Sequence, residues 1–153
     1  MILRVAFVLL LFVMACSNDS HPKGDQIEFD INVLKSDPMI ADFVQRHPDW
    51  PVIKYARADL NNDGCPDVIV IYRIAKDANR MRVILDVGDK YADTNEVPAP
   101  IYDQSIVFRD IDKKPPLEFI VQGRKGAKIG YAIFRIENNQ LIDIFGEGME
   151  DCC

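Results

Sequence analysis

The sequence has no apolar run long enough to cross a membrane as a helix. Its longest run, Met1–Met14, is interrupted only by Arg4, whereas a membrane-spanning helix needs about 20 apolar residues. Runs of Lys or Arg are also absent, and the 153 residues carry a formal net charge of −6. An acidic chain without a basic patch binds poorly to nucleic acid and to anionic lipid headgroups, so we expect neither as a partner.

The familiar catalytic motifs are missing as well. The chain has only two histidines, His21 and His47, and neither has neighbours that would complete a Cys–His pair or a Ser–His–Asp set. Neither a phosphate-binding loop nor a dinucleotide fingerprint occurs. These absences disfavour a hydrolase or a transferase, and they leave open whether the protein is an enzyme.

The first residues have the pattern of an export signal. A basic residue, Arg4, precedes a short apolar region of the length found in signal peptides. The region ends in Val13-Met14-Ala15-Cys16, which resembles the lipobox of bacterial lipoproteins. The resemblance implies that residues 1–15 are a lipoprotein signal peptide and that a diacylglyceryl group is attached to Cys16. The alternative is a signal peptide that is removed without lipidation.

The predicted anchor is followed by a polar tether over residues 16–26. Ser17, at the second position after cleavage, is typical of lipoproteins that go on to an outer membrane where the host has two membranes. We therefore expect an exported protein of the bacterial cell envelope, anchored in the membrane by lipid such as palmitate on Cys16. Export places the other cysteines (Cys65, Cys152 and Cys153) in an oxidising compartment.

Residues 27–145 predict a single β-rich domain. Ile27–Val33 alternates apolar and polar residues, which favours a strand or an extended entry segment. Ser36–Arg46 predicts a short helix, because Ser36 or Asp37 can cap it and Pro38 fits its first turn. The apolar residues on one face of this helix are Met39, Ile40, Phe43 and Val44.

The rest of the domain contains an internal repeat. Residues 59–70 align without a gap on residues 110–121, at an offset of 51. Each copy predicts one strand before the aligned loop and two after it. The predicted strands are Val52–Ala58, Val68–Tyr72, Arg82–Val87, Ile106–Arg109, Phe119–Val121 and Tyr131–Glu137, followed by Gln140–Phe145. Two copies are too few for a closed propeller, so we expect an α+β fold: a mostly antiparallel β-sheet from two pseudo-repeats, with the helix on one face.

The first copy of the repeat carries a candidate metal loop. Oxygen-bearing side chains stand at loop positions one, three, five and nine, with Gly64 at position six; they belong to Asp59, Asn61, Asp63 and Asp67. With the backbone carbonyl of Cys65, this spacing can surround a hard cation. The pattern resembles the calcium loops of FG-GAP and VCBS repeats, which implies that these five groups bind Ca²⁺. The alternative is a polar turn closed by Asx hydrogen bonds without an ion.

The loop of the second copy is altered. Asp110, Asp112 and Glu118 persist, but Lys114 replaces the carboxylate at position five and Pro115 replaces the glycine. We expect the Lys114 ammonium to take the place of the cation there. The sequence therefore predicts one calcium site, with a stabilising rather than a catalytic role.

The sequence ends in two adjacent cysteines, Cys152 and Cys153, in a predicted flexible tail over residues 146–153. Three kinds of chemistry are open to them. Both sulfurs can bind a soft metal or metalloid ion, which thiolates favour. They can form a strained disulfide with each other that is easily reduced. Alternatively, one of them can pair with Cys65.

A lipoprotein-like start, a small domain and a terminal Cys-Cys together resemble the Cys-Cys-COOH (seleno)protein family SaoC. The resemblance implies redox or soft-ligand chemistry at Cys152 or Cys153. The first functional hypothesis is therefore a redox or metal-handling lipoprotein, with an envelope protein or a thioredoxin-like reductant as its partner. The alternative is a calcium-stabilised protein-binding module in which the tail is incidental.

Overall fold

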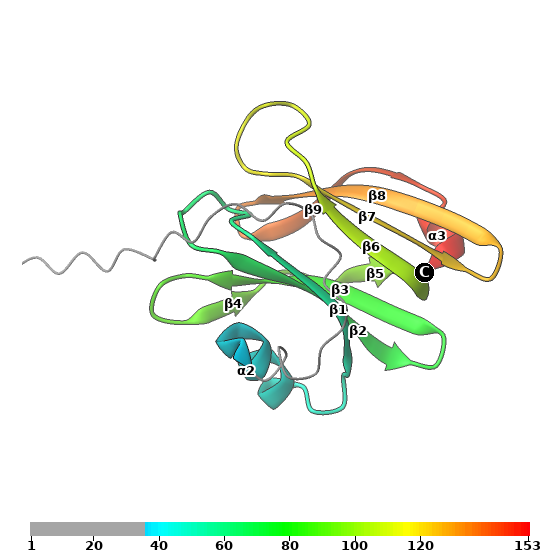
Figure 1. Ribbon diagram of the computed structural model, residues 1–153, viewed down its shortest axis with the longest axis horizontal. Coiled ribbons are helices and arrows are strands. Elements are labelled where there is room, and N and C mark those ends of the chain that lie inside the picture. The colour runs from blue at the N-terminus through cyan, green and yellow to red at the C-terminus, as the bar shows by residue number, and fades with distance from the viewer. Residues whose placement is uncertain (1–35) are drawn as a thin grey trace, which may run out of the picture.

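Two stacked antiparallel β-sheets form the core of this protein, whose computed structural model describes residues 36–153 (Figure 1). Sheet A has the strand order β1 (Val52–Ala58), β2 (Asp67–Ala75), β3 (Ala78–Asp86) and β4 (Tyr91–Asp93), and β5 (Val97–Ala99) also pairs with β3. Sheet B consists of β6 (Tyr102–Phe108), β7 (Phe119–Lys125), β8 (Lys128–Glu137) and β9 (Gln140–Glu147). Helix α2 (Pro38–Arg46) precedes the strands, and helix α3 (Met149–Cys152) follows them.

The predicted fold class, mostly antiparallel β-sheet with a short helix before it, is confirmed. The two copies of the repeat form one sheet each instead of sharing a single sheet. The predicted signal peptide, the Cys16 tether and the strand at Ile27–Val33 lie outside the described residues. Within residues 36–153, no helix is long and apolar enough to span a bilayer.

Helix α2 begins where the sequence predicts. The Asp37 carboxylate caps it by accepting hydrogen bonds from the backbone N–H groups of Met39 (2.9 Å) and Ile40 (3.4 Å). Pro38, which has no N–H to leave unsatisfied, occupies the first turn. Met39, Ile40 and Phe43 are fully buried against sheet A, whereas Val44, predicted on the same face, is 43% exposed.

The repeat is visible in the strand pairing. Ala56 pairs with Ile69 between β1 and β2, and Val107 pairs with Ile120 between β6 and β7, so both partners shift by 51. An irregularity between Arg73 and Ala75 has no counterpart in β7. The second hairpin is therefore one residue shorter, and β8 follows β3 at an offset of 50.

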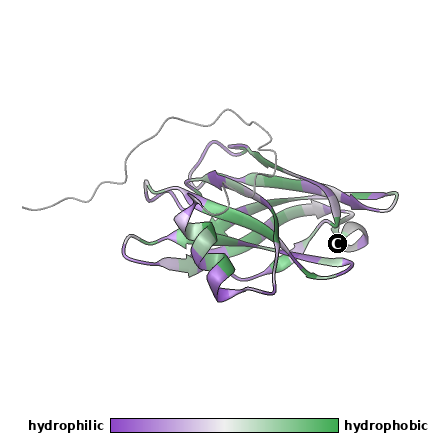
Figure 2. Cartoon of the chain, turned by 60° about the horizontal axis from the view of Figure 1, so that its bottom comes forward, coloured by the Kyte–Doolittle hydropathy of each residue, from purple (hydrophilic) through white to green (hydrophobic). Residues whose placement is uncertain are grey.

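The two sheets pack through non-equivalent faces. Sheet A uses the face that α2 does not cover, and sheet B uses the face that corresponds, by the repeat, to the α2-covered face of sheet A. On β2, Val68 packs beneath α2, whereas Ile69 faces sheet B. The counterpart of Val68 in the second copy is Phe119, which faces sheet A. The core between the sheets consists of Leu60, Ile69, Ile71, Met81, Val83, Leu85, Ala99, Phe119, Val121, Ala132, Phe134, Ile136 and Leu141. Figure 2 shows hydrophobic residues along the strands of both sheets and hydrophilic residues in many of the turns.

A cluster of charges and aromatic rings ties α2 to sheet A. Arg46 and Arg82 both contact the Asp93 carboxylate, at 2.6 Å and 3.1 Å. Burial alone would raise the pKa of Asp93, but the two guanidinium groups outweigh it and lower that pKa below its ordinary value. The His47 ring stacks on Trp50 at 4.2 Å between centroids. Burial and the neighbouring Arg46 and Arg82 charges lower the pKa of His47, which favours the uncharged ring in this stack.

Candidate functional site

The loop over residues 59–66 joins β1 to β2, and Asp67 lies at its end. The Asp67 carboxylate is fully buried and accepts hydrogen bonds from the backbone N–H groups of Leu60 (2.9 Å) and Asp86 (3.0 Å). Burial raises its pKa to about 7, despite the two hydrogen bonds, and the charges of Asp63 and Asp59 add to the rise. Asp67 therefore fastens this loop to β3.

The other predicted calcium ligands lie near the surface and accept hydrogen bonds from their own loop. Asp59 accepts from the backbone N–H groups of Asp63 (3.2 Å) and Gly64 (3.0 Å). Asn61 accepts from Asp63 N–H at 3.1 Å, and Asp63 accepts from Cys65 N–H at 2.8 Å. Gly64 has φ +88°, the left-handed conformation that suits glycine. These contacts are the Asx turns of the ion-independent alternative.

The second loop uses a buried carboxylate in the same way. Glu118 is 1% exposed and accepts the backbone N–H of Ile111 at 3.0 Å, as Asp67 accepts that of Leu60. Ligand atoms of Asp110, Asp112 and Glu118 lie within 4.8 Å of one another, the only such group in the described part of the chain.

The cation of the second loop is Arg135 of β8. Its Nη1 lies 3.2 Å from Asp112 Oδ2 and 3.4 Å from Glu118 Oε1. The prediction that the Lys114 ammonium fills this role is wrong: within residues 36–153 Lys114 makes no ion pair, and it contributes its backbone N–H to Asp112 at 2.9 Å. Arg135 lies 17 residues after Glu118, on the second strand after the loop, so the loop sequence gives no sign of it.

Within residues 36–153, the first loop has no such internal cation. Strand pairing places Leu85 at the position equivalent to Arg135, and Leu85 is buried between the sheets. None of Asp59, Asp63 and Asp67 forms a salt bridge with another residue of the described chain. A set of oxygen donors with no cation beside it in the described part of the chain has the chemistry that calcium prefers.

The Cys-Cys segment is partly helical. Residues predicted as a loose tail form the end of β9 and the one-turn helix α3, which packs on β8. Gly148 has φ +67°, and a side chain there would meet the Ile129 carbonyl at 2.7 Å, so glycine permits the close approach. A salt bridge of 2.6 Å joins Lys128 to Asp151. One helical turn is too short to show a hydrophobic period, which is why sequence reasoning missed it.

Cys153 is a half-buried thiol, and its Sγ lies 4.0 Å from the Sδ of Met149. The structure therefore does not contain the disulfide between Cys152 and Cys153. Cys65 lies in the loop between β1 and β2, at the end of the sheets opposite to α3 (Figure 1). It is in a disulfide with a sulfur that is not among the described side chains, so it is not joined to Cys153.

The chain matches no family model, no curated protein and no solved structure. The resemblances to lipoprotein signals, to FG-GAP and VCBS loops and to the SaoC family therefore rest on the motifs themselves.

Proposed function

We propose that this protein is an exported lipoprotein, anchored through Cys16, whose terminal thiols bind a soft metal ion. The supporting observation is the seating of α3 on sheet B, which holds Cys153 as a thiol on a folded surface. Ordering a loose tail around an ion would cost conformational entropy, and a seated turn lowers that cost. Thiolate sulfur prefers soft ions.

Part of the negative charge around the two thiols is offset in this proposal. Lys128 pairs with Asp151 and so offsets one of the negative charges beside the two thiols. The partner would be an envelope protein that delivers or accepts the ion close to the membrane. A thioredoxin-like reductant would keep both sulfurs in the reduced form that binds metal.

Metal binding by the tail is tested on the full-length protein, purified in detergent and reduced. Titration with Ag(I), followed by native mass spectrometry, is expected to give one ion per chain. The double variant Cys152→Ser/Cys153→Ser should lose that ion, and Cys65→Ser is the matched control that should keep it. Equal Ag(I) binding by the double variant would contradict the proposal.

Anchoring is tested separately with Cys16→Ala, which should move the protein from the membrane fraction to the soluble fraction. Mass spectrometry of the wild-type N-terminal peptide should show a diacylglyceryl group on Cys16. A disulfide between Cys16 and Cys65 would use the same sulfur, so finding that linked peptide would reject lipidation. A peptide that links Cys65 to Cys152 would instead reject the pair of tail thiols.

The second candidate function is a calcium-stabilised protein-binding module. It is favoured by the lack of a described cation at Asp59, Asp63 and Asp67, where the other copy has Arg135. Calcium at about 100 times its Kd should stabilise the fold by about 2.7 kcal/mol, which raises the Tm by several degrees.

The calcium experiment compares thermal unfolding in calcium with unfolding in a chelator. Asp63→Ala should abolish the difference in Tm, and Asp112→Ala, in the second loop, is the control that should retain it. Identical Tm values for the wild type in calcium and in chelator would reject the calcium site.

A further inference from the structure

We infer that the outer face of sheet B is a dimer interface, covered by the same face of a second copy of the chain. A row of apolar side chains crosses all four strands on this face. Strand pairing joins its members in the order Val107, Ile120, Ile133 and Phe145. Val107 is 48% exposed and Phe145 is 52% exposed, so both ends of the row are open to solvent. A sheet face that meets only water usually carries polar residues at such positions.

The first copy of the repeat shows what the equivalent row does when it is covered. The counterparts of the first three members are Ala56, Ile69 and Val83, which pair in the same order across β1, β2 and β3. Ile69 and Val83 are fully buried in the core between the sheets. These strand positions are therefore a packing surface in sheet A. Sheet B keeps apolar side chains of equal or greater size at the same positions, on its uncovered side.

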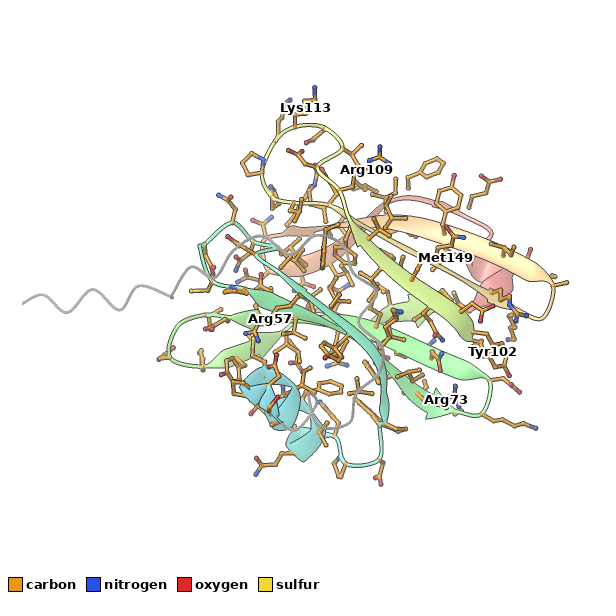
Figure 3. The ribbon with its side chains drawn as sticks, in the orientation of Figure 1. Arg57, Arg73, Tyr102, Arg109, Lys113 and Met149 are labelled. Carbon is orange, nitrogen blue, oxygen red and sulfur yellow. The ribbon has the colours of Figure 1, made fainter. Side chains whose placement is uncertain are left out.

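No element within residues 36–153 covers the outer face of sheet B. Helix α2 packs on the far side of sheet A, as Figure 1 shows. Helix α3 lies toward the inner side of sheet B, because Met149 packs against the core between the sheets. In Figure 3 side chains stand out from the outer side of sheet B with no described element over them. Ile142, which is 36% exposed, extends the apolar row on β9 to a patch of the kind that marks interaction sites.

Charge and shape identify the occupant as a second copy. The charged residues at the outward positions of β7, β8 and β9 balance one another; they are Arg124, Arg135, Glu137 and Glu147. The whole chain carries −6, so two copies repel each other elsewhere but can meet at this neutral face. A flat apolar sheet face packs well on another sheet face, and a two-fold axis brings the same face from each copy together. Anionic lipid would instead require a patch of Lys and Arg.

The size of the face sets the expected strength of the dimer. Four strands about 4.8 Å apart and about 25 Å long give a face of roughly 500 Å², so two copies bury roughly 1,000 Å² in total. That area lies at the lower end of the range for specific interfaces. We therefore expect a dimer that dissociates at micromolar concentrations.

Sedimentation of the full-length protein in density-matched detergent tests the dimer. The wild type should change from monomer to dimer between about 5 and 200 μM. Phe145→Lys and Val107→Lys should each stay monomeric, because each buries an unpaired ammonium in the interface. Both side chains are exposed in the single chain, so the Tm should change little. Ile74→Lys, at a residue of β2 in sheet A that is 40% exposed, is the matched control that should dimerise as the wild type does.

The variants also separate this dimer from a disulfide-linked one. All of them keep the four cysteines, so a disulfide-linked dimer would persist in each. A wild type that stays monomeric at about 200 μM, or a dimer that survives either Phe145→Lys or Val107→Lys, would overturn the inference.

Photocrosslinking identifies what covers the face. Benzoylphenylalanine in place of Phe145 is irradiated in the full-length protein with phosphatidylcholine vesicles, and the links are mapped by mass spectrometry. Links to β6, β7, β8 or β9 of a second copy are expected. Links to lipid alone would overturn the dimer and assign the face to the membrane surface. Links to sheet A of a second copy would show that the copies meet through another face and would also overturn it.

Discussion

The two copies of the repeat share a loop design but balance its charge differently. In each, a buried carboxylate (Asp67 or Glu118) accepts the N–H of the residue seven positions before it. The second loop is neutralised by Arg135, whereas Leu85 stands at the equivalent place in the first copy. Arg135 lies on the outer face of sheet B, where a charged side chain reaches solvent, and Leu85 lies between the sheets. The packing of the sheets thus decides which loop can pair with a charged residue at this strand position. The position faces solvent in β8 and the core in β3.

The same contrast runs through the central strands. Six consecutive residues of β2, from Asp67 to Tyr72, are buried, because sheet B covers one face and α2 the other. Strand β7 alternates buried and more exposed residues, because one of its faces is open. Large apolar residues of sheet B remain exposed within the described chain, namely Val107, Ile129, Ile142, Ile144 and Phe145. The equivalent strands β2 and β7 therefore have different burial patterns, because β2 is covered on both faces and β7 on one.

The largest expected effect comes from removing the buried carboxylates that the two loops share. Asp67→Ala should lower the free energy of unfolding by about 2–4 kcal/mol, since it leaves two backbone N–H groups without an acceptor. Glu118→Ala should cost less, about 1–3 kcal/mol, since it leaves one backbone N–H without an acceptor, and Arg135 keeps its pairs with Asp112 and Glu137. Urea denaturation measures both, with Asp67→Asn as the milder control. Equal losses in the two alanine variants would contradict the comparison.

A smaller loss of stability should follow from weakening the contacts that hold α2 on sheet A. Asp93→Asn weakens its contacts with Arg46 and Arg82 and should cost about 1–3 kcal/mol at neutral pH. The folded-state pKa of Asp93 lies below its ordinary value of 3.8, so its stabilisation is complete above that value and is lost as the pH falls through the lower folded-state pKa.

The stability gap between wild type and Asp93→Asn should therefore be constant above about pH 5 and narrow below about pH 4. Urea denaturation across this range measures the gap. Asp103→Asn, which alters an exposed pair with Arg124 on sheet B, is the control that should show little change. A stability gap that widens in acid would show that the pKa of Asp93 is not lowered in the folded state.

The smallest effect, and the sharpest test of the comparison, is expected from Arg135→Leu. This change gives the second loop the residue found in the first copy and leaves Asp110, Asp112 and Glu118 without their cation. The Tm should fall slightly in chelator and recover on addition of calcium. A variant whose Tm does not respond to calcium beyond the wild-type response would show that the carboxylates of the second loop do not by themselves make a calcium site.

Local sequence signals determined much of the fold. Asp37 and Pro38 marked the start of α2 through capping and proline geometry, and Pro48 required it to end soon after Arg46. Val52–Ala58 matched β1 residue for residue, and the offset of 51 located the second copy. These signals depend on neighbours within a few residues, or on a repeat that is written in the chain itself.

Contacts between distant residues decided the rest. Sheet A packs on sheet B through the face that α2 does not cover, and this depends on which face of each sheet is buried. The pairing of Arg135, and not Lys114, with the second loop depends on a strand outside that loop. The position of Met149 beside Cys153 depends on the packing of α3. A strand's alternation shows that it has two faces, but only the packing of the sheets assigns one face to the core and the other to solvent.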